Sequence, residues 1–350
     1  MSRIINFNEA ILEATDEILT NHCNCIVVGL GVPDPKGIFG TTLGLTEKFG
    51  SNRVYDMPTA ENAMTGIAIG AAINGIRPIM THQRVEFSLL GIEQLINQAA
   101  KWHYMTGGKS SVPLVIRLIV GRGWGQGPQH SQFLEPIFAH VPGLKVVCPS
   151  SAYEAKGLLW SAFKDDNPVI FFEHRWLHST KSIVPDTPYS LPIGKCNIVE
   201  EGTDFTLVSY SYGLTDCRKI AKILKSFDIH PEIIDVRSLR PIDHQTIIES
   251  VKKTGRLLCI DNGWSHMNVA AEIISNVVTE SFDSLKCAPQ RIGIVDVPIP
   301  STRSLANLVY PSLKDIAHKI ETIMERKIFP NHFSFPENQD VPDQSFTGPF

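Results

Sequence analysis

Three stretches of the sequence gather polar side chains that packing does not require, and each follows an apolar run. In the first, Thr59 is expected to cap a helix whose first turn contains Glu61. The second crowds together His82, Gln83, Arg84, Glu86 and Phe87. The third, GRGWGQGPQHSQ, contains His130, an imidazole that can transfer protons near neutral pH. The residues predict a binding or catalytic site, although Glu61 alone could simply stabilise the start of its helix.

Common motifs do not account for the glycine-rich third stretch. Its glycines alternate from Gly121 to Gly127 instead of following G-x-G-x-x-G, and the sequence has no GxxxxGK[ST] and no GxSxG. His174 and His178 stand four residues apart, but no third ligand lies nearby, so we expect no metal there. The third stretch is therefore interpreted as an irregular loop with a histidine available for proton transfer.

Short apolar runs alternate with helical patterns along the chain, which predicts parallel sheets covered by helices. We expect strands within residues 25–32, 53–58, 77–82, 114–120, 144–150, 168–176, 204–213, 231–241, 256–263 and 291–298. Helices are expected at 92–100 and 214–227 from apolar spacing, and after Ser151 from its capping box with Glu154. Ligands bind beyond the carboxyl ends of parallel strands, which is where the three polar stretches lie.

Length and composition predict two domains and exclude several classes of protein. The chain has 350 residues, more than one core usually supports, and a proline-rich stretch interrupts it near its middle. We place a first domain at 1–183, a linker at 184–197, a second domain at 198–327 and a tail at 328–350. The tail is rich in phenylalanine and proline without periodicity, so it either docks on a surface or is disordered.

The net charge of −4, without a basic run, argues against nucleic-acid binding. No apolar run is long enough for a membrane helix and the N-terminus lacks a signal peptide, so we expect a cytoplasmic protein. The seven cysteines are scattered, which is typical of reduced, buried thiols.

Longer segments resemble one protein family. They are RVYDMPTAENAMTGIAIGAAINGIRPI, IEQLINQAAKWHYMTGG, PQHSQ, HVPGLKVVCPSSAYEAKGLL, DNPVIFFEH, VRSLRPID and VDVPIP, in matching order over residues 3–325. The chain resembles the beta subunit of thiamine diphosphate-dependent 2-oxo acid dehydrogenases of the pyruvate and branched-chain type. The resemblance implies an α/β fold: a transketolase-type pyrimidine-binding domain, with helices on both faces of a parallel sheet, and a transketolase C-terminal domain.

The resemblance also implies roles for the polar residues. Glu61 matches the carboxyl group that shares a proton with the pyrimidine ring of thiamine diphosphate and so helps to form the thiazolium carbanion. Phe87 matches the aromatic residue that packs on that ring, and Gln83 stands where a methionine often lies beside it. His130 matches the active-site histidine that handles the substrate carboxylate and acyl transfer.

A structural potassium site is a further implication. Family members that bind this ion use oxygen atoms of the turn after a helix, and the matching residues are Leu114, Ala162, Phe163, Asp165 and Asn167. Oxygen-rich turns suit a hard cation, although they also form without one.

The sequence contains no GDG motif, with which this superfamily holds the diphosphate through Mg²⁺. The resemblance therefore implies a separate alpha subunit that binds Mg²⁺ and the diphosphate, in an α2β2 heterotetramer with a beta–beta contact. It also implies decarboxylation of a 2-oxo acid and transfer of the acyl group to the lipoyl domain of an acyltransferase component.

Departures from the family pattern leave the substrate and the acceptor open. The glycine-rich stretch is shorter than in pyruvate dehydrogenases, and Arg122, Trp124, Gln129 and the more distant His140 mark a candidate substrate region. Arg122 could bind a carboxylate or phosphate, or it could merely cover the loop. An acyloin-forming or transketolase-like synthase, with an aldehyde or a sugar as acceptor, is the main alternative. A non-catalytic scaffold is disfavoured because the matching acid, aromatic residue and histidine are all present.

Overall fold

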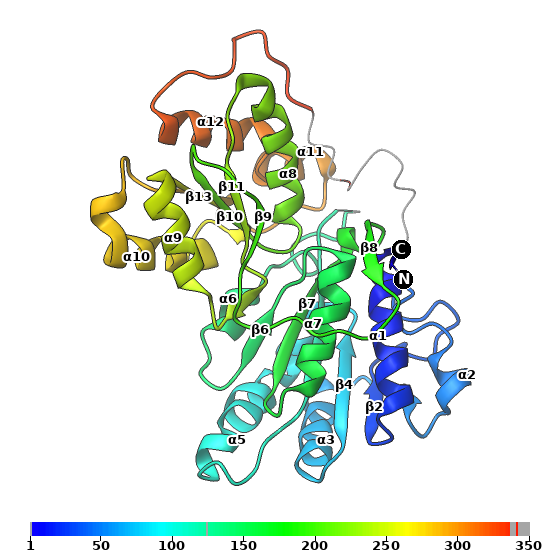
Figure 1. The fold of residues 1–350 in the computed structure, drawn as a ribbon. Helices are drawn as coiled ribbons and strands as arrows, with labels where there is room; N and C mark the ends of the chain where they lie inside the picture. The colour runs from blue at the N-terminus through cyan, green and yellow to red at the C-terminus, as the bar shows by residue number, and fades with distance from the viewer. Residues whose placement is uncertain (1, 124, 337–340, 342–350) are drawn as a thin grey trace. The chain divides into compact units, whose positions relative to one another are not determined.

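The computed structural model describes residues 2–123, 125–336 and 341, and its chain divides into two compact units (Figure 1). The first unit comprises Met1–Val120, Ile137–Ile193 and Leu239–Pro241. The second unit comprises Gly121–Pro136, Gly194–Ser238 and Ile242–Phe350. Within the described residues, no helix is both long and apolar enough to cross a membrane.

The first unit is built on a seven-stranded sheet with the order β12-β6-β7-β5-β4-β2-β3. The pairs from β6 to β3 are parallel, as the alternation of strands and helices predicted. Its strands are β2 (Cys25–Val28), β3 (Val54–Tyr55), β4 (Arg77–His82), β5 (Val115–Val120), β6 (Lys145–Val147), β7 (Val169–His174) and β12 (Ser238–Arg240). All residues of β5 and β7 are buried, as expected for central strands with both faces covered.

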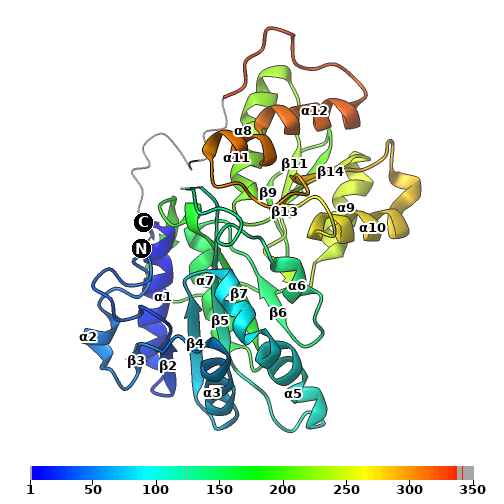
Figure 2. The same ribbon diagram turned by 180° about the vertical axis from the view of Figure 1, so that it is seen from behind.

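Helices pack on this sheet (Figures 1 and 2). They are α1 (Phe7–Asn21), α2 (Leu45–Phe49), α3 (Glu61–Ile73), α4 (Val85–Ser88), α5 (Ala100–Met105), α6 (Glu135–Ala139) and α7 (Ala152–Lys164). Short 3₁₀ turns lie at Leu89–Gly91 and Arg175–Leu177. The helix predicted at 92–100 is present, but a π-helical segment at Gln94–Ala99 leads into α5.

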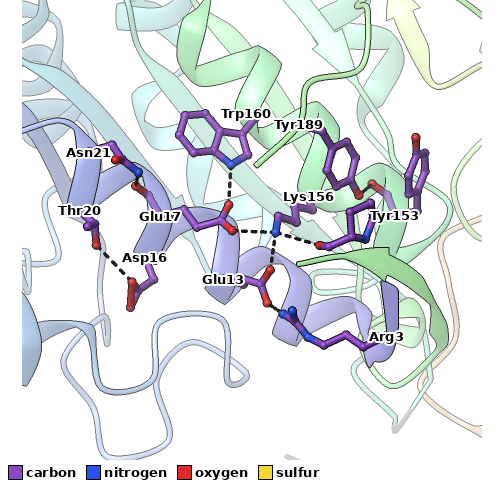
Figure 3. A network of polar contacts seen from close by, with 11 residues as sticks. Arg3, Glu13, Asp16, Glu17, Thr20, Asn21, Tyr153, Lys156, Trp160 and Tyr189 are labelled. Carbon is purple, nitrogen blue, oxygen red and sulfur yellow. Dashed lines mark hydrogen bonds and ion pairs between the residues drawn. The ribbon is translucent and has the colours of Figure 1, made fainter. Parts of the chain in front are cut away.

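A buried lysine joins α1 to α7 (Figure 3). The Lys156 side chain is 0% exposed; its ammonium contacts a carboxylate oxygen of Glu13 and lies 2.8 Å from Glu17 Oε1 and 3.2 Å from the carbonyl of Pro185. Trp160 donates to the other Glu17 oxygen at 2.8 Å. Pro185 ends β8 (Lys181–Pro185), which pairs antiparallel with β1 (Ser2–Asn6), so this one ammonium group ties three segments together.

The start of the predicted linker is held against α7. The Leu191 amide donates to the carbonyl of Gly157 at 3.1 Å, and the Tyr189 hydroxyl donates to the carbonyl of Tyr153 at 2.5 Å. A Cβ on Gly157 would lie 2.6 Å from side-chain atoms of both Leu191 and Tyr189, so a glycine is needed for this close approach.

The second unit contains a five-stranded sheet with the order β14-β13-β10-β11-β9. Only β9 runs antiparallel. The strands are β9 (Asn197–Glu200), β10 (Thr206–Ser209), β11 (Glu232–Asp235), β13 (Leu257–Trp264) and β14 (Gln290–Ile294). The helices are α8 (Gly213–Leu224), α9 (His244–Thr254), α10 (Val269–Ser281), α11 (Arg303–Val309) and α12 (Leu313–Met324), with 3₁₀ turns at Lys225–Phe227 and Phe282–Ser284. The predicted stripe of α8 is buried in the core.

The run 231–241, predicted as one strand, instead forms two. Its first part is β11 of the five-stranded sheet, and its last part is β12 of the seven-stranded sheet. Between them Arg237 adopts a left-handed backbone conformation, with φ of 56°, which ends the first strand.

The beginning of the predicted tail docks on its own second unit. Phe329 is 4% exposed and its ring lies 5.2 Å from that of Phe227, while Phe333 and Phe335 pack against Phe329. The Glu321 carboxylate accepts hydrogen bonds from the amides of Ile328 and Phe329 at 2.9 and 3.0 Å. Docking is therefore confirmed for residues 328–336; residues 337–340 and 342–350 lie outside the described residues.

Two predicted helix starts differ in detail. Ala60, not Thr59, is the N-cap of α3, because the Ala60 amide donates to the Pro58 carbonyl at 2.7 Å in a tight turn that leaves Thr59 outside the helix. At α7, Ser151 is the N-cap as predicted, but the Glu154 carboxylate accepts from the amide and hydroxyl of Ser150.

Candidate active site

The first turn of α3 presents a buried carboxylate. Glu61 is the first residue of the helix and is 6% exposed. No described residue donates a hydrogen bond to its carboxylate oxygens, although buried polar groups almost always have a partner. The helix N-terminus favours negative charge at this position. The described residues therefore leave the hydrogen-bonding capacity of this carboxylate unused.

The segment with Phe87 packs beside that turn. Phe87 lies half-buried in α4, which continues into the 3₁₀ turn ending at Gly91. A Cβ on Gly91 would lie 2.6 Å from Thr65 Oγ1 and 3.2 Å from the Glu61 carbonyl oxygen. A glycine permits this contact, so the segment is held close to the backbone of the first turn of α3. A buried carboxyl group and a partly exposed aromatic ring, on two elements that pack together, are the residue types that the planar, nitrogen-containing ring of an aminopyrimidine requires.

Gln83 connects the end of β4 to the loop after β2. Its side-chain amide donates to the Leu30 carbonyl at 2.9 Å. A Cβ on the next residue, Gly31, would lie 2.6 Å from Gln83 Nε2. Gln83 therefore lies at the carboxyl edge of the sheet, as predicted, with its amide nitrogen engaged by the backbone.

Two arginines concentrate positive charge at the same edge. Arg84 follows β4 and Arg175 follows β7, and the Arg175 guanidinium lies 4.4 Å from the centre of the Phe39 ring. Burial and the nearby charge of Arg84 lower the pKa of Arg175 to about 10. The sequence pattern assigns no role to Arg84 and does not mark Arg175. Their combined charge suits an anionic ligand.

The glycine-rich segment packs within the second unit. Gly123, Gly125 and Gly127 have φ between 67° and 93°, which favours glycine. A Cβ on Gly127 would lie 2.3 Å from Ser301 Oγ, so the segment also lies close against the side chain of Ser301. Glycine therefore serves both the backbone conformation and the close contact.

The predicted substrate region is not one cluster of contacts. Arg122 places its guanidinium 4.0 Å from the centre of the Tyr310 ring, Gln129 is exposed, and His130 is half-buried with its amide 3.4 Å from the Gly127 carbonyl. His140 is exposed after α6. Trp124 lies outside the described residues. The contact of Arg122 with Tyr310 favours the interpretation that this arginine covers the loop.

The residues predicted to hold potassium lie together, but Arg77 occupies part of their oxygen set. Its guanidinium donates to the Phe163 carbonyl at 2.7 Å and to the Asp165 carbonyl at 2.7 Å. The Asp165 carboxylate also pairs with Lys145. The remaining carbonyls accept backbone amides: Leu114 from Val169 at 2.9 Å and Ala162 from Asp165 at 3.3 Å. Arg77 and Lys145 thus already neutralise the turn, and a potassium ion would have to bind beside these two side chains.

Metal ligation is not evident elsewhere in the described part of the chain, where no group of three or more His, Cys, Asp or Glu side chains converges. His174 accepts the Trp176 amide at 3.1 Å, whereas His178 Nε2 lies 3.3 Å from Glu173 Oε2. The two histidines therefore have separate partners.

Comparison with known proteins gives this geometry its family. Residues 4–179 match the transketolase pyrimidine-binding domain, and residues 194–316 match the transketolase C-terminal domain. The chain is similar to the beta subunit of acetoin:2,6-dichlorophenolindophenol oxidoreductase of Cupriavidus necator, with 40% identity over 91% of this chain and 96% of that one. It is also similar to the pyruvate dehydrogenase E1 beta subunit of Rickettsia felis, with 38% identity over 91% of this chain and 98% of that one. The chain belongs to the beta-subunit family of thiamine diphosphate-dependent 2-oxo acid dehydrogenases.

A solved structure supports the fold. A chain titled as a split-gene transketolase in an inactive beta4 tetramer superposes with a TM-score of 0.74, covering 92% of this chain and 98% of that one, at 20% identity. The predicted fold class, two transketolase-type α/β domains, is confirmed, as is the resemblance to the beta-subunit family.

This beta-subunit chain also contains polar groups whose burial the sequence does not predict. Arg117 and Glu173 form a fully buried ion pair, with Arg117 Nη2 2.8 Å from Thr41 Oγ1. Burial by itself raises the pKa of Glu173, but Arg117 and His178 outweigh it and hold the pKa below its usual range. Nearby in β4, His82 is buried without a hydrogen-bond partner in the described residues. The sequence showed these residue types, but only packing shows that they are enclosed.

Proposed function

We propose that this chain is the beta subunit of a heteromeric enzyme that decarboxylates a 2-oxo acid and transfers the acyl group to a lipoyl domain. The observation that carries the proposal is Glu61, a buried residue at the start of α3 whose carboxylate accepts no hydrogen bond from the described residues, in a domain of the pyrimidine-binding family. Family membership and the names of the most similar relatives support it. Thiamine diphosphate, when bound, supplies the carbanion that attacks the oxo acid and the electron sink for decarboxylation.

The residues of this chain would bind, orient and move protons. Glu61 would hold a proton against the pyrimidine nitrogen in a buried environment where water does not compete. Phe87 would fix the ring plane, with Gln83 beside it. Arg84 and Arg175 would attract the substrate carboxylate, and His130 would transfer a proton as the acyl group leaves.

The proposal requires an alpha subunit. The sequence lacks the GDG motif, so Mg²⁺ and the diphosphate would be bound mainly by that partner, in an α2β2 assembly with a beta–beta contact. The same proposal assigns residues 1–183 to the pyrimidine-binding domain, 184–197 to the linker, 198–327 to the C-terminal domain, and the enzyme to the cytoplasm. The matches at 4–179 and 194–316 support the domain boundaries.

Glu61→Gln in the assembled enzyme tests the proposal. The amide keeps the size of the side chain but cannot share a carboxyl proton, so deuterium exchange at the thiazolium C2 position should slow by about 10²–10⁴-fold. Quenched-flow NMR measures the exchange. His130→Ala is the matched variant: its C2 exchange should persist while acyl transfer falls. Exchange of Glu61→Gln at the wild-type rate would refute the role of Glu61.

A second candidate is an enzyme that makes or cleaves an acyloin. The relative named for acetoin, itself an acyloin, favours it. A screen of 2-oxo acids with a dye, a lipoyl domain, aldehydes or sugars as acceptor separates the two: turnover with an aldehyde or sugar but not with the lipoyl domain would replace the first candidate.

A further inference from the structure

A buried histidine ends β4, the strand that leads into the segment with Gln83 and Phe87. His82 is 3% exposed, and neither ring nitrogen forms a hydrogen bond with a described residue. Burial lowers its pKa to about 4, so the ring is neutral near pH 7, with one N–H donor and one acceptor nitrogen. A buried polar group without a partner is costly and calls for an explanation.

The neighbouring helix places His82 level with Glu61. Thr65 Oγ1 of α3 lies 3.9 Å from Met80 Sδ of β4. The ribbon shows α3 beside β4 (Figures 1 and 2). His82 shares the face of Met80 and lies two residues further toward the carboxyl end, about 6–7 Å along a strand. Glu61 lies four residues before Thr65, about 6 Å along the helix. Because α3 ends where the chain turns back into β4, the two displacements run in the same direction.

The first turn of α3 therefore carries a carboxylate without a donor, and the strand beside it carries an imidazole without an acceptor. Gly91, which follows the segment with Phe87, packs on the Glu61 carbonyl in the same turn of α3. The two side chains are not hydrogen-bonded to each other in the structure, so a rotation of either one would be needed to join them.

We propose that His82 is a positioning residue for Glu61: in the cofactor-loaded enzyme its imidazole N–H donates to one carboxyl oxygen and leaves the other to the pyrimidine nitrogen. The proposal rests on the proposed function of Glu61. A carboxyl group held at one oxygen can present the other in a fixed direction, and such preorganisation is what a positioned acid requires.

Two variants of β4 separate positioning from structure. His82→Phe keeps a ring but removes both nitrogens. Thr81→Val is the control, because Thr81 Oγ1 is also buried without a partner among the described residues but points to the opposite face of the strand. If neither group has a structural partner, both variants should leave the melting temperature of the chain without cofactor unchanged or raised.

In the assembled enzyme the two variants should differ. His82→Phe should slow deuterium exchange at the thiazolium C2 position at least about tenfold, His82→Gln should restore part of the rate, and Thr81→Val should keep the wild-type rate. An exchange rate of His82→Phe within twofold of the wild type would overturn the proposal. A melting temperature lowered in His82→Phe alone, without cofactor, would also overturn it, because the imidazole would then have a structural partner such as water.

Cofactor binding by the wild type separates a failure of the proposed function from a failure of the role of His82. If the wild-type assembly itself binds no thiamine diphosphate by titration calorimetry, the proposed function and the role of His82 fall together. If the wild type binds the cofactor and exchanges while His82→Phe does the same, only the role of His82 falls.

Discussion

The burial of His82 predicts how the stability of the chain depends on pH. Its pKa is about 4 in the folded chain against 6.5 for the ordinary group, so the unfolded chain binds more protons between these values. Stability is therefore fully present above about pH 6.5 and is lost as the pH falls toward about pH 4. Between about pH 7.5 and about pH 5, this one group should remove about 2 kcal/mol from the free energy of unfolding.

Comparison with His82→Phe isolates the effect. Burial also lowers the pKa values of His178 and His244, so the wild type alone would report several groups. Urea unfolding of the wild type and of His82→Phe at the two pH values gives the difference between their free energies of unfolding. Where unfolding has more than one transition, the transition that responds to the substitution is compared. His82→Phe should gain about 2 kcal/mol relative to the wild type on going to the lower pH. A difference that does not depend on pH would refute the burial of a neutral imidazole at this position.

Three further predictions concern the rest of the fold. Lys156→Met should lower the free energy of unfolding by about 3 kcal/mol, since it leaves Glu13 and Glu17 without their buried cation. The control Lys48→Met removes an exposed pair with Asp16 and should cost less than about 1 kcal/mol. Urea unfolding measures both values, and equal costs would contradict the network. Phe329→Ala should lower the free energy of unfolding of the second unit by about 3 kcal/mol, whereas Ser334→Ala, at an exposed neighbour, is the control. Light scattering should show the same oligomeric state for both variants. A change in assembly would show that the Phe329 ring packs on a partner. Because Arg77 and Lys145 already neutralise the turn at Asp165, the melting temperature should be equal in KCl and NaCl at the same ionic strength, and a rise specific to K⁺ would show that the ion binds beside Arg77.

The strands could be predicted because central parallel strands are apolar on both faces. The run 114–120 became β5 and the run 168–176 contained β7, both buried throughout. The pair β1 and β8 was missed because SRIIN and KSIVP are short and partly exposed. The split of 231–241 was missed because the apolar run is continuous, and only the backbone at Arg237 breaks it.

The candidate site could be predicted only in part. Glu61 could be placed in a first helical turn because its neighbours mark a helix start, and the resemblance to the family then gave it a role. The isolation of His82 depends on how α3, β4 and the turn at Gly91 pack together, which no local pattern encodes. Arg175 was hidden in an apolar run, and its proximity to Arg84 follows from strands distant in sequence.

The unpartnered groups of β4 and α3 have a consequence for assembly. A chain that encloses His82 without a hydrogen bond from any described residue loses stability in its isolated form, because the imidazole was hydrated before folding. Interactions elsewhere, such as that of Lys156 with two carboxylates, must offset this loss. A ligand that supplies the missing hydrogen bonds binds only the folded chain and therefore stabilises it. If His82 has the role proposed for it, cofactor binding and folding of the first unit are coupled through this side chain, and a variant that stabilises the free chain at His82 weakens that coupling.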